Sequence, residues 1–130
     1  MEKKFFASLW PLLLLFPKEG SLDTVLPYFK VGTASWYSES DAGIHSRTAN
    51  GEIFDDSQLT CASWDFPFDT HLRVTHLVSG KQVICRVNDR GPAKRLERLI
   101  DLTKGAFQEI APLDLGLIQV KVEVIPREDY

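Results

Sequence analysis

The sequence has few of the residues that bind metal ions. It contains two cysteines, Cys61 and Cys85, which lack the CxxC spacing of common metal sites. The three histidines are scattered and form no recognisable ligand set with them; they are His45, His71 and His76. We therefore expect no metal ion and no other cofactor. No cysteine precedes Cys61, so we also expect no lipid attachment at an N-terminal cysteine.

No apolar run reaches the length of about 20 residues that a membrane-spanning helix needs. The longest such run, 5–16, contains Ser8 and Pro11 and follows a short charged start. This pattern is typical of a signal peptide. We expect a signal peptide over 1–20, with its cleavage site left open, and no stable membrane span after its removal. The protein is then exported to the periplasm or cell envelope, whereas the alternative is a buried N-terminal helix.

The sequence also has no excess of positively charged residues. Fifteen Lys and Arg residues stand against 18 Asp and Glu residues, for a net charge of −3. General nucleic-acid-binding proteins are usually basic, so we expect no nucleic-acid partner. A length of 130 residues fits one domain, and we expect a monomer.

Helical periodicity is scarce in this chain. One helix is predicted near 103–111, where Thr103 is a suitable N-cap and Pro112 ends the pattern. Residues 21–30 read as a linker. Apolar and polar residues alternate afterwards, which predicts strands; these cover 31–38, 59–64, 72–78, 81–87 and 118–124. Short strands with a single short helix predict a mainly β fold, a small barrel.

Two further local features can be read from the sequence. Ser79-Gly80 has the composition of a two-residue hairpin turn between strands. Cys61 and Cys85 each lie in a strand-like run, and a cysteine pair in an exported protein favours a disulfide. Two separate buried thiols are the alternative.

Three segments carry polar motifs. They are Ala34-Ser35-Trp36-Tyr37 with Thr48-Ala49-Asn50-Gly51-Glu52, Thr60-Cys61-Ala62-Ser63, and Asn88-Asp89-Arg90-Gly91-Pro92 with Ile100-Asp101-Leu102-Thr103. In this order and spacing they resemble the rare lipoprotein A family. The resemblance implies a six-stranded double-psi β-barrel, here over 31–126 with a tail at 127–130. It also implies a place in the bacterial envelope and lytic transglycosylase activity on peptidoglycan glycan strands.

Asp89 is the predicted catalytic residue. A lytic transglycosylase must protonate the leaving glycosidic oxygen and then deprotonate the sugar's own 6-hydroxyl, and one carboxyl group can do both in turn. Asp89 stands where a strand gives way to the Arg90-Gly91-Pro92 turn, so its side chain can face a groove. The alternative is a turn-forming Asp bonded to local amides.

Other residues of the motifs are predicted to bind the glycan. Arg90 is expected to orient a carboxyl group or the sugar, although a structural role is open. Trp36 and Tyr37 offer flat faces for sugar rings, with core packing as the alternative. The full predicted binding set is Trp36, Tyr37, Asn50, Glu52, Ser63 and Arg90. Asp101, between aliphatic residues before the helix, is read as a buried brace or helix cap.

Ser63 departs from the family pattern, in which a histidine often stands at this position. A serine can bond a sugar hydroxyl but cannot exchange protons near neutral pH. Two alternatives to an enzyme therefore remain open: a glycan-binding barrel without catalysis, and an expansin-like protein that loosens wall polymers. The basic residues of this region either meet anionic groups of the wall or form a solvated loop; they are Arg86, Arg90, Lys94, Arg95 and Arg98.

Overall fold

The structure, a computed structural model, describes residues 28–129. The expected signal peptide and most of the expected linker lie outside this range. Within 28–129 no helix is both long enough and apolar enough to cross a membrane.

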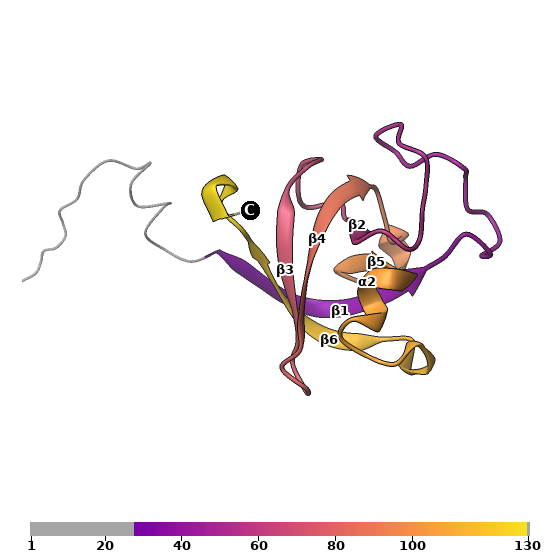
Figure 1. Ribbon diagram of the computed structural model, residues 1–130. Coiled ribbons are helices and arrows are strands. Elements are labelled where there is room, and N and C mark those ends of the chain that lie inside the picture. The colour runs from indigo at the N-terminus through magenta and orange to yellow at the C-terminus, as the bar shows by residue number, and fades with distance from the viewer. Residues whose placement is uncertain (1–27, 130) are drawn as a thin grey trace, which may run out of the picture.

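The described residues form a closed barrel of six strands (Figure 1). The strands are β1 (Phe29–Tyr37), β2 (Thr60–Ala62), β3 (His71–His76), β4 (Gln82–Asp89), β5 (Ile100–Thr103) and β6 (Ile118–Val124). Around the barrel their order is β1-β5-β2-β4-β3-β6. The β1–β5 and β2–β4 pairs are parallel and the other pairs antiparallel. The predicted mainly β, six-stranded barrel is thus confirmed.

Alternation along the strands fills the barrel. In β3 the buried residues are Leu72, Val74 and His76, as the period-2 pattern predicts. In β6, Ile118, Val120 and Val122 point inward. The aliphatic side chains at these positions join one continuous apolar core that includes Phe107 and Ile110 from the segment after β5.

The single α-helix of the described residues, α2 (Lys104–Gln108), is shorter than the predicted 103–111. Thr103 caps it as expected, since its side chain accepts from the Ala106 N–H at 3.2 Å. After Gln108 the chain continues as a turn, with the Ala111 N–H donating to the Phe107 carbonyl at 3.0 Å. The predicted apolar face is nevertheless buried over this whole stretch.

Two predicted boundaries need correction at β1 and after β3. β1 begins at Phe29, inside the expected linker, because Phe29 and Lys30 already pair with β6. β3 ends at His76 and β4 begins at Gln82, so the connection is a five-residue loop over 77–81, not a two-residue Ser79-Gly80 turn. The loop closes through the His76 N–H to the Lys81 carbonyl (2.9 Å), and Gly80 adopts the φ of +79° that the turn requires.

Three short 3-10 turns complete the fold: η1 (Lys94–Leu96), η2 (Leu113–Leu115) and η3 (Arg127–Asp129). The last occupies most of the expected C-terminal tail. In Figure 1 the 38–59 loop between β1 and β2 extends beyond one end of the barrel.

The predicted disulfide is present. Cys61 on β2 and Cys85 on the neighbouring β4 are bonded, with their Cα atoms 5.9 Å apart. Both are almost completely buried in the core. The bond therefore ties two paired strands together from inside the barrel.

Replacing both cysteines with serine should lower the free energy of unfolding by about 3.5 kcal/mol. The chain-entropy relation gives this value for a closed loop of about 25 residues. Urea unfolding of the double variant and of the oxidised parent measures the difference. A change below about 1 kcal/mol would contradict a stabilising role for the bond.

Candidate active site

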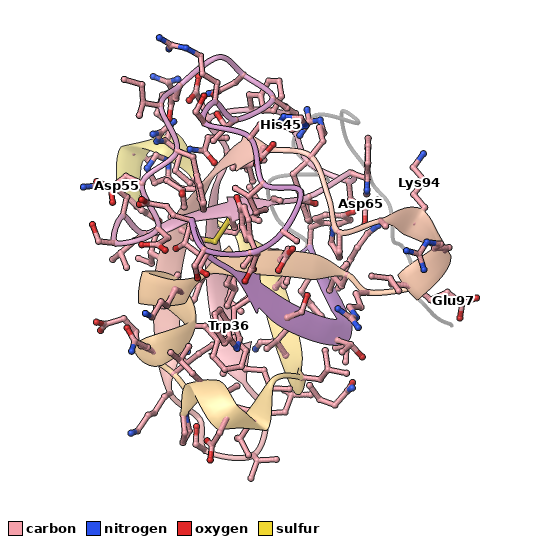
Figure 2. The ribbon with its side chains drawn as sticks, turned by 90° about the vertical axis from the view of Figure 1, so that its right-hand side faces the viewer. Trp36, His45, Asp55, Asp65, Lys94 and Glu97 are labelled. Atoms are coloured by element: carbon pink, nitrogen blue, oxygen red, sulfur yellow. A yellow bond between two sulfur atoms is a disulfide. The ribbon has the colours of Figure 1, made fainter. Side chains whose placement is uncertain are left out.

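A cleft of about 740 Å³ opens at the end of the barrel where β1 and β4 finish. Its walls come from the ends of β1, β4 and β5, the 38–59 loop and the turn after β4. The charged and aromatic residues that line it include Trp36, Tyr37, His45, Arg47, Asp89 and Asp101. Figure 2 shows Trp36 and His45 well apart along the height of the molecule, and both belong to this cleft.

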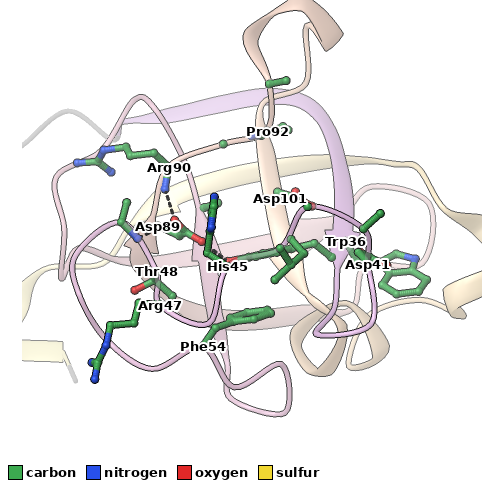
Figure 3. Close-up of a pocket in the computed structure, with 18 residues that line it drawn as sticks. Trp36, Asp41, His45, Arg47, Thr48, Phe54, Asp89, Arg90, Pro92 and Asp101 are labelled. Carbon is green, nitrogen blue, oxygen red and sulfur yellow. Dashed lines mark hydrogen bonds between the residues drawn. The ribbon is translucent and has the colours of Figure 1, made fainter.

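Asp89, the last residue of β4, lies in the cleft as predicted. Its Oδ1 accepts from the N–H groups of Ala49 and Arg90, both at 2.9 Å. Its Oδ2 accepts from the Tyr37 hydroxyl at 3.3 Å. Figure 3 shows the carboxyl group at the junction of the loop and the strand end. Only the bond from the Arg90 N–H is of the local kind that the alternative describes, and the side chain still faces the cleft.

Tyr37 positions this carboxyl group from the end of β1. Its ring stacks on Phe54, with centroids 4.9 Å apart and planes 8° apart. Burial, and secondarily the nearby charge of Asp89, raises the pKa of Tyr37 well above its usual range. The phenol therefore keeps its proton and remains a hydrogen-bond donor to Asp89.

Asp101 is a second carboxyl group in the same cleft, and the sequence reading did not assign it a chemical role. Ile100 and Leu102 are fully buried in the barrel, so Asp101 between them points out of the core. The Ser35 hydroxyl donates to it at 3.1 Å. Burial raises the pKa of Asp101 to about 6, against the opposing effects of the Ser35 bond and of Arg98. Thr103, not Asp101, caps the helix. This strand was not among those predicted, although the alternation of Ile100, Asp101 and Leu102 could have indicated that Asp101 lies outside the core.

Asn50 and Glu52 brace the loop and do not line the cleft. The Glu52 carboxylate accepts two bonds from Arg86, at 2.8 and 2.9 Å, and one from Asn88 at 3.0 Å. The Asn50 amide also donates to it at 3.0 Å. These bonds, those of Arg86 first, lower the pKa of Glu52 to about 2. Glu52 is therefore ionised at neutral pH and holds the loop against β4.

Arg90 also performs a structural task. Its guanidinium lies 3.8 Å from the centre of the Phe68 ring and donates to the carbonyls of Ser63 (2.9 Å) and Phe66 (3.1 Å). Only its main-chain N–H reaches Asp89. The expected basic cluster is divided accordingly, because Arg86 pairs with Glu52 and Asp69 while Arg90 faces the chain after β2.

Ser63 is not among the residues that line the cleft. It is fully buried, and its hydroxyl accepts from the Asp65 N–H at 3.0 Å. The predicted contact of this hydroxyl with a sugar therefore needs correction, because the Ser63 side chain has no exposed surface. The Ser63 hydroxyl thus stabilises the start of the connection between β2 and β3.

Replacing Arg90 with methionine should lower the free energy of unfolding by about 2 kcal/mol. The variant keeps the apolar stem but removes two charged hydrogen bonds to carbonyls and the contact with Phe68. Urea unfolding measures the change, with Arg95→Met in the exposed η1 turn as the control. Equal stability of the two variants would contradict the structural role of Arg90.

Trp36 is divided between core and cleft. Its indole N–H donates to the Leu113 carbonyl at 3.0 Å, and its ring packs beside Phe107 with centroids 6.4 Å apart. Part of the side chain still lines the cleft. The expected sugar contact therefore stays a prediction for Trp36, as it does for Tyr37.

A cluster of carboxyl groups lies outside the cleft. Oxygen atoms of Glu39, Asp55 and Asp56 lie within 4.8 Å of one another. Glu39 and Asp56 already accept each other's main-chain N–H groups, at 3.2 and 2.9 Å. Exposed acidic groups are common on protein surfaces, and these two bonds explain why Glu39 and Asp56 lie together.

Comparison with known proteins identifies relatives of this chain. A family model described as "Lytic transglycolase" matches residues 30–122. "Endolytic peptidoglycan transglycosylase RlpA" of Pseudomonas aeruginosa is 45% identical over 98 residues, which are 75% of this chain and 28% of that protein. The protein of the same name from Campylobacter jejuni is 44% identical over 95 residues, 72% of this chain and 33% of that protein. The chain thus spans about a third or less of the length of these relatives.

Solved structures share the barrel. The Streptomyces papain inhibitor matches with a TM-score of 0.61 and 23% identity, over 76% of this chain and 96% of that one. The expansin of Clavibacter michiganensis matches with a TM-score of 0.61 and 18% identity, over 77% and 52%. At these identities the likeness concerns the fold alone. The family match and the closed six-stranded barrel together establish that the chain belongs to the rare lipoprotein A family of double-psi β-barrel proteins.

Proposed function

We propose that this chain is an endolytic peptidoglycan lytic transglycosylase that cleaves glycan strands after N-acetylmuramic acid and leaves 1,6-anhydro ends. The observation that carries the proposal is the pair of carboxyl groups, Asp89 and Asp101, in one cleft. The names of the relatives support the same activity.

The two carboxyl groups have environments suited to different tasks. Asp101 is largely buried with a pKa of about 6, so it retains a proton at a higher pH than an exposed carboxyl group does. Such a group suits protonation of the leaving glycosidic oxygen. Asp89 acts as the acceptor in all three of its hydrogen bonds, from the Tyr37 hydroxyl and from the N–H groups of Ala49 and Arg90. It therefore suits stabilisation of the positive charge that develops on the sugar ring as the bond breaks.

This division refines the expectation that Asp89 performs both proton transfers. A single carboxyl group must change protonation state between the two steps, whereas two groups in different environments can each keep one task. Asp89 remains the proposed catalytic carboxylate, and Asp101 becomes the proposed proton donor. The substrate is the glycan strand of peptidoglycan, and we place the protein in the cell envelope.

Mass analysis of purified glycan strands after incubation with the protein tests this function. We expect new fragments with 1,6-anhydro ends. Reducing ends would indicate hydrolysis instead. Intact strands that still bind the protein would favour the glycan-binding barrel, the alternative suggested by Ser63 at the position where the family often has histidine.

A further inference from the structure

One titratable residue of the cleft has no role in the chemistry described so far. His45 lines the cleft together with Asp89 and Asp101. Among the described residues it is the only histidine there, because His71 and His76 belong to β3 and do not line the cleft. The residues before and after it in the loop gave no sequence signal for this placement.

The loop holds His45 between two anchors. Ile44 packs on the small apolar cluster of Tyr37, Phe54 and Ala62. On the other side, the Ser46 carbonyl accepts from the Phe54 N–H at 2.9 Å. Both neighbours of His45 are thus tied to Phe54, whose ring stacks on the tyrosine that contacts Asp89. The backbone of His45 is therefore fixed relative to the carboxyl group.

The side chain itself remains accessible. His45 is exposed, and it lines the same cleft as Asp89 (Figure 3). The other charged residues that line the cleft are Asp41, Arg47, Asp89, Arg90 and Asp101. Imidazole exchanges protons near neutral pH more readily than other side chains, and it needs solvent access to do so in every cycle.

The proposed reaction leaves one task unassigned. When the bond between C1 and the glycosidic oxygen breaks, the leaving oxygen takes a proton from Asp101. The 6-hydroxyl oxygen then bonds to C1 and must lose its own proton to a base. Asp89 is engaged with three donors and serves the charge on the ring. The proton of the 6-hydroxyl group can return to the ionised Asp101 or go to another group that lines the cleft.

We propose that His45 is the catalytic base that takes the proton of the 6-hydroxyl group. This inference rests on the proposed function. In the step, the neutral imidazole gains the proton from O6 as the O6–C1 bond forms, and Asp101 has lost one proton to the leaving oxygen. Solvent then takes the proton from the exposed imidazole and returns one to Asp101, so that the cycle closes without consuming water.

The test uses the full chain with His45→Gln, His45→Ala and the neighbouring control Ser46→Ala. We expect His45→Gln to lower kcat on glycan strands about 10²-fold with KM changed less than about twofold. Ser46→Ala should cleave as the parent does. Added imidazole should restore at least a tenth of the parent rate to His45→Ala, because the site is open to solvent.

The outcomes separate this inference from the proposed function. Cleavage by His45→Gln at the parent rate would overturn the inference and leave the proposed function standing. A loss of cleavage that imidazole does not restore, or one matched by an equal rise in KM, would assign His45 to positioning and also overturn it. A parent chain that produces no anhydro ends would remove the proposed function and the inference together.

Discussion

Replacing Asp89 with asparagine should reduce glycan cleavage by about 10³-fold while leaving folding and glycan binding nearly unchanged. The amide oxygen can still accept from the N–H groups of Ala49 and Arg90, and the amide nitrogen can donate to the Tyr37 oxygen. Only the negative charge is lost from the site. The rate of appearance of anhydro ends, with thermal unfolding as a check on the fold, measures the effect.

Asp114→Asn is the matched control for this experiment, since Asp114 is exposed in η2 and does not line the cleft. It should cleave strands at the parent rate. Full activity in Asp89→Asn would remove Asp89 as a catalytic residue. Unfolding of that variant would instead identify Asp89 as a turn residue needed for the fold.

Replacing Asp101 with asparagine should lower cleavage by about 10²–10³-fold and at the same time stabilise the protein at neutral pH. In the parent, the proton that Asp101 donates is lost as pH rises through about 6. Parent activity should therefore decline about tenfold per pH unit above that value. Asparagine cannot supply the proton, although it can still accept from the Ser35 hydroxyl. A pH–rate profile of both proteins measures these effects.

The stability change has the opposite sign to the activity change. The pKa of Asp101 is higher in the folded protein than in the unfolded chain, so ionisation disfavours the folded state. The contribution of protonated Asp101 to the free energy of unfolding is therefore fully present below about pH 4, and it is lost as the pH rises through about 6. The difference between a pKa of about 6 in the folded protein and the ordinary pKa of an Asp side chain corresponds to at most about 3 kcal/mol of folding free energy. Asp101→Asn should gain up to that amount at pH 7.5 and nothing at pH 4; an equal difference at both pH values would contradict the burial of an ionisable carboxyl group.

Five of the six strands, the helix position and the disulfide could be predicted from the sequence because each depends on local pattern, whereas β5 was not among the predicted strands. Val120 and Val122 alternate with polar residues, and a period of two places them on one side of any strand. A threonine before a helix can accept a hydrogen bond from the free amides of its first turn, as Thr103 does from Ala106. The cysteine pair needed only an oxidising environment and two neighbouring strands. Asp89 could be proposed for the same reason, since a motif at a strand end identifies it.

Turn geometry and side-chain roles depended on contacts between distant segments. The 77–81 loop is longer than its Ser-Gly pair suggests, because pairing of β3 with β6 and β4 decides where β3 ends. Arg90 and Glu52 have the composition of a binding site, but neighbours more than twenty residues away engage their charged groups. No local pattern encodes such partners.

The sequence by itself determined that this chain forms a barrel of short strands, which residues fill it, and which motif ends at Asp89. Only the tertiary structure decided which groups share the cleft. Closure of the barrel sets β5 beside both β1 and β2, and this brings Asp101 next to Ser35 and into the cleft with Asp89. The 38–59 loop, anchored by Ile44 and Phe54, adds His45. Burial and proximity, which set the protonation of these groups, exist only once the strands are paired.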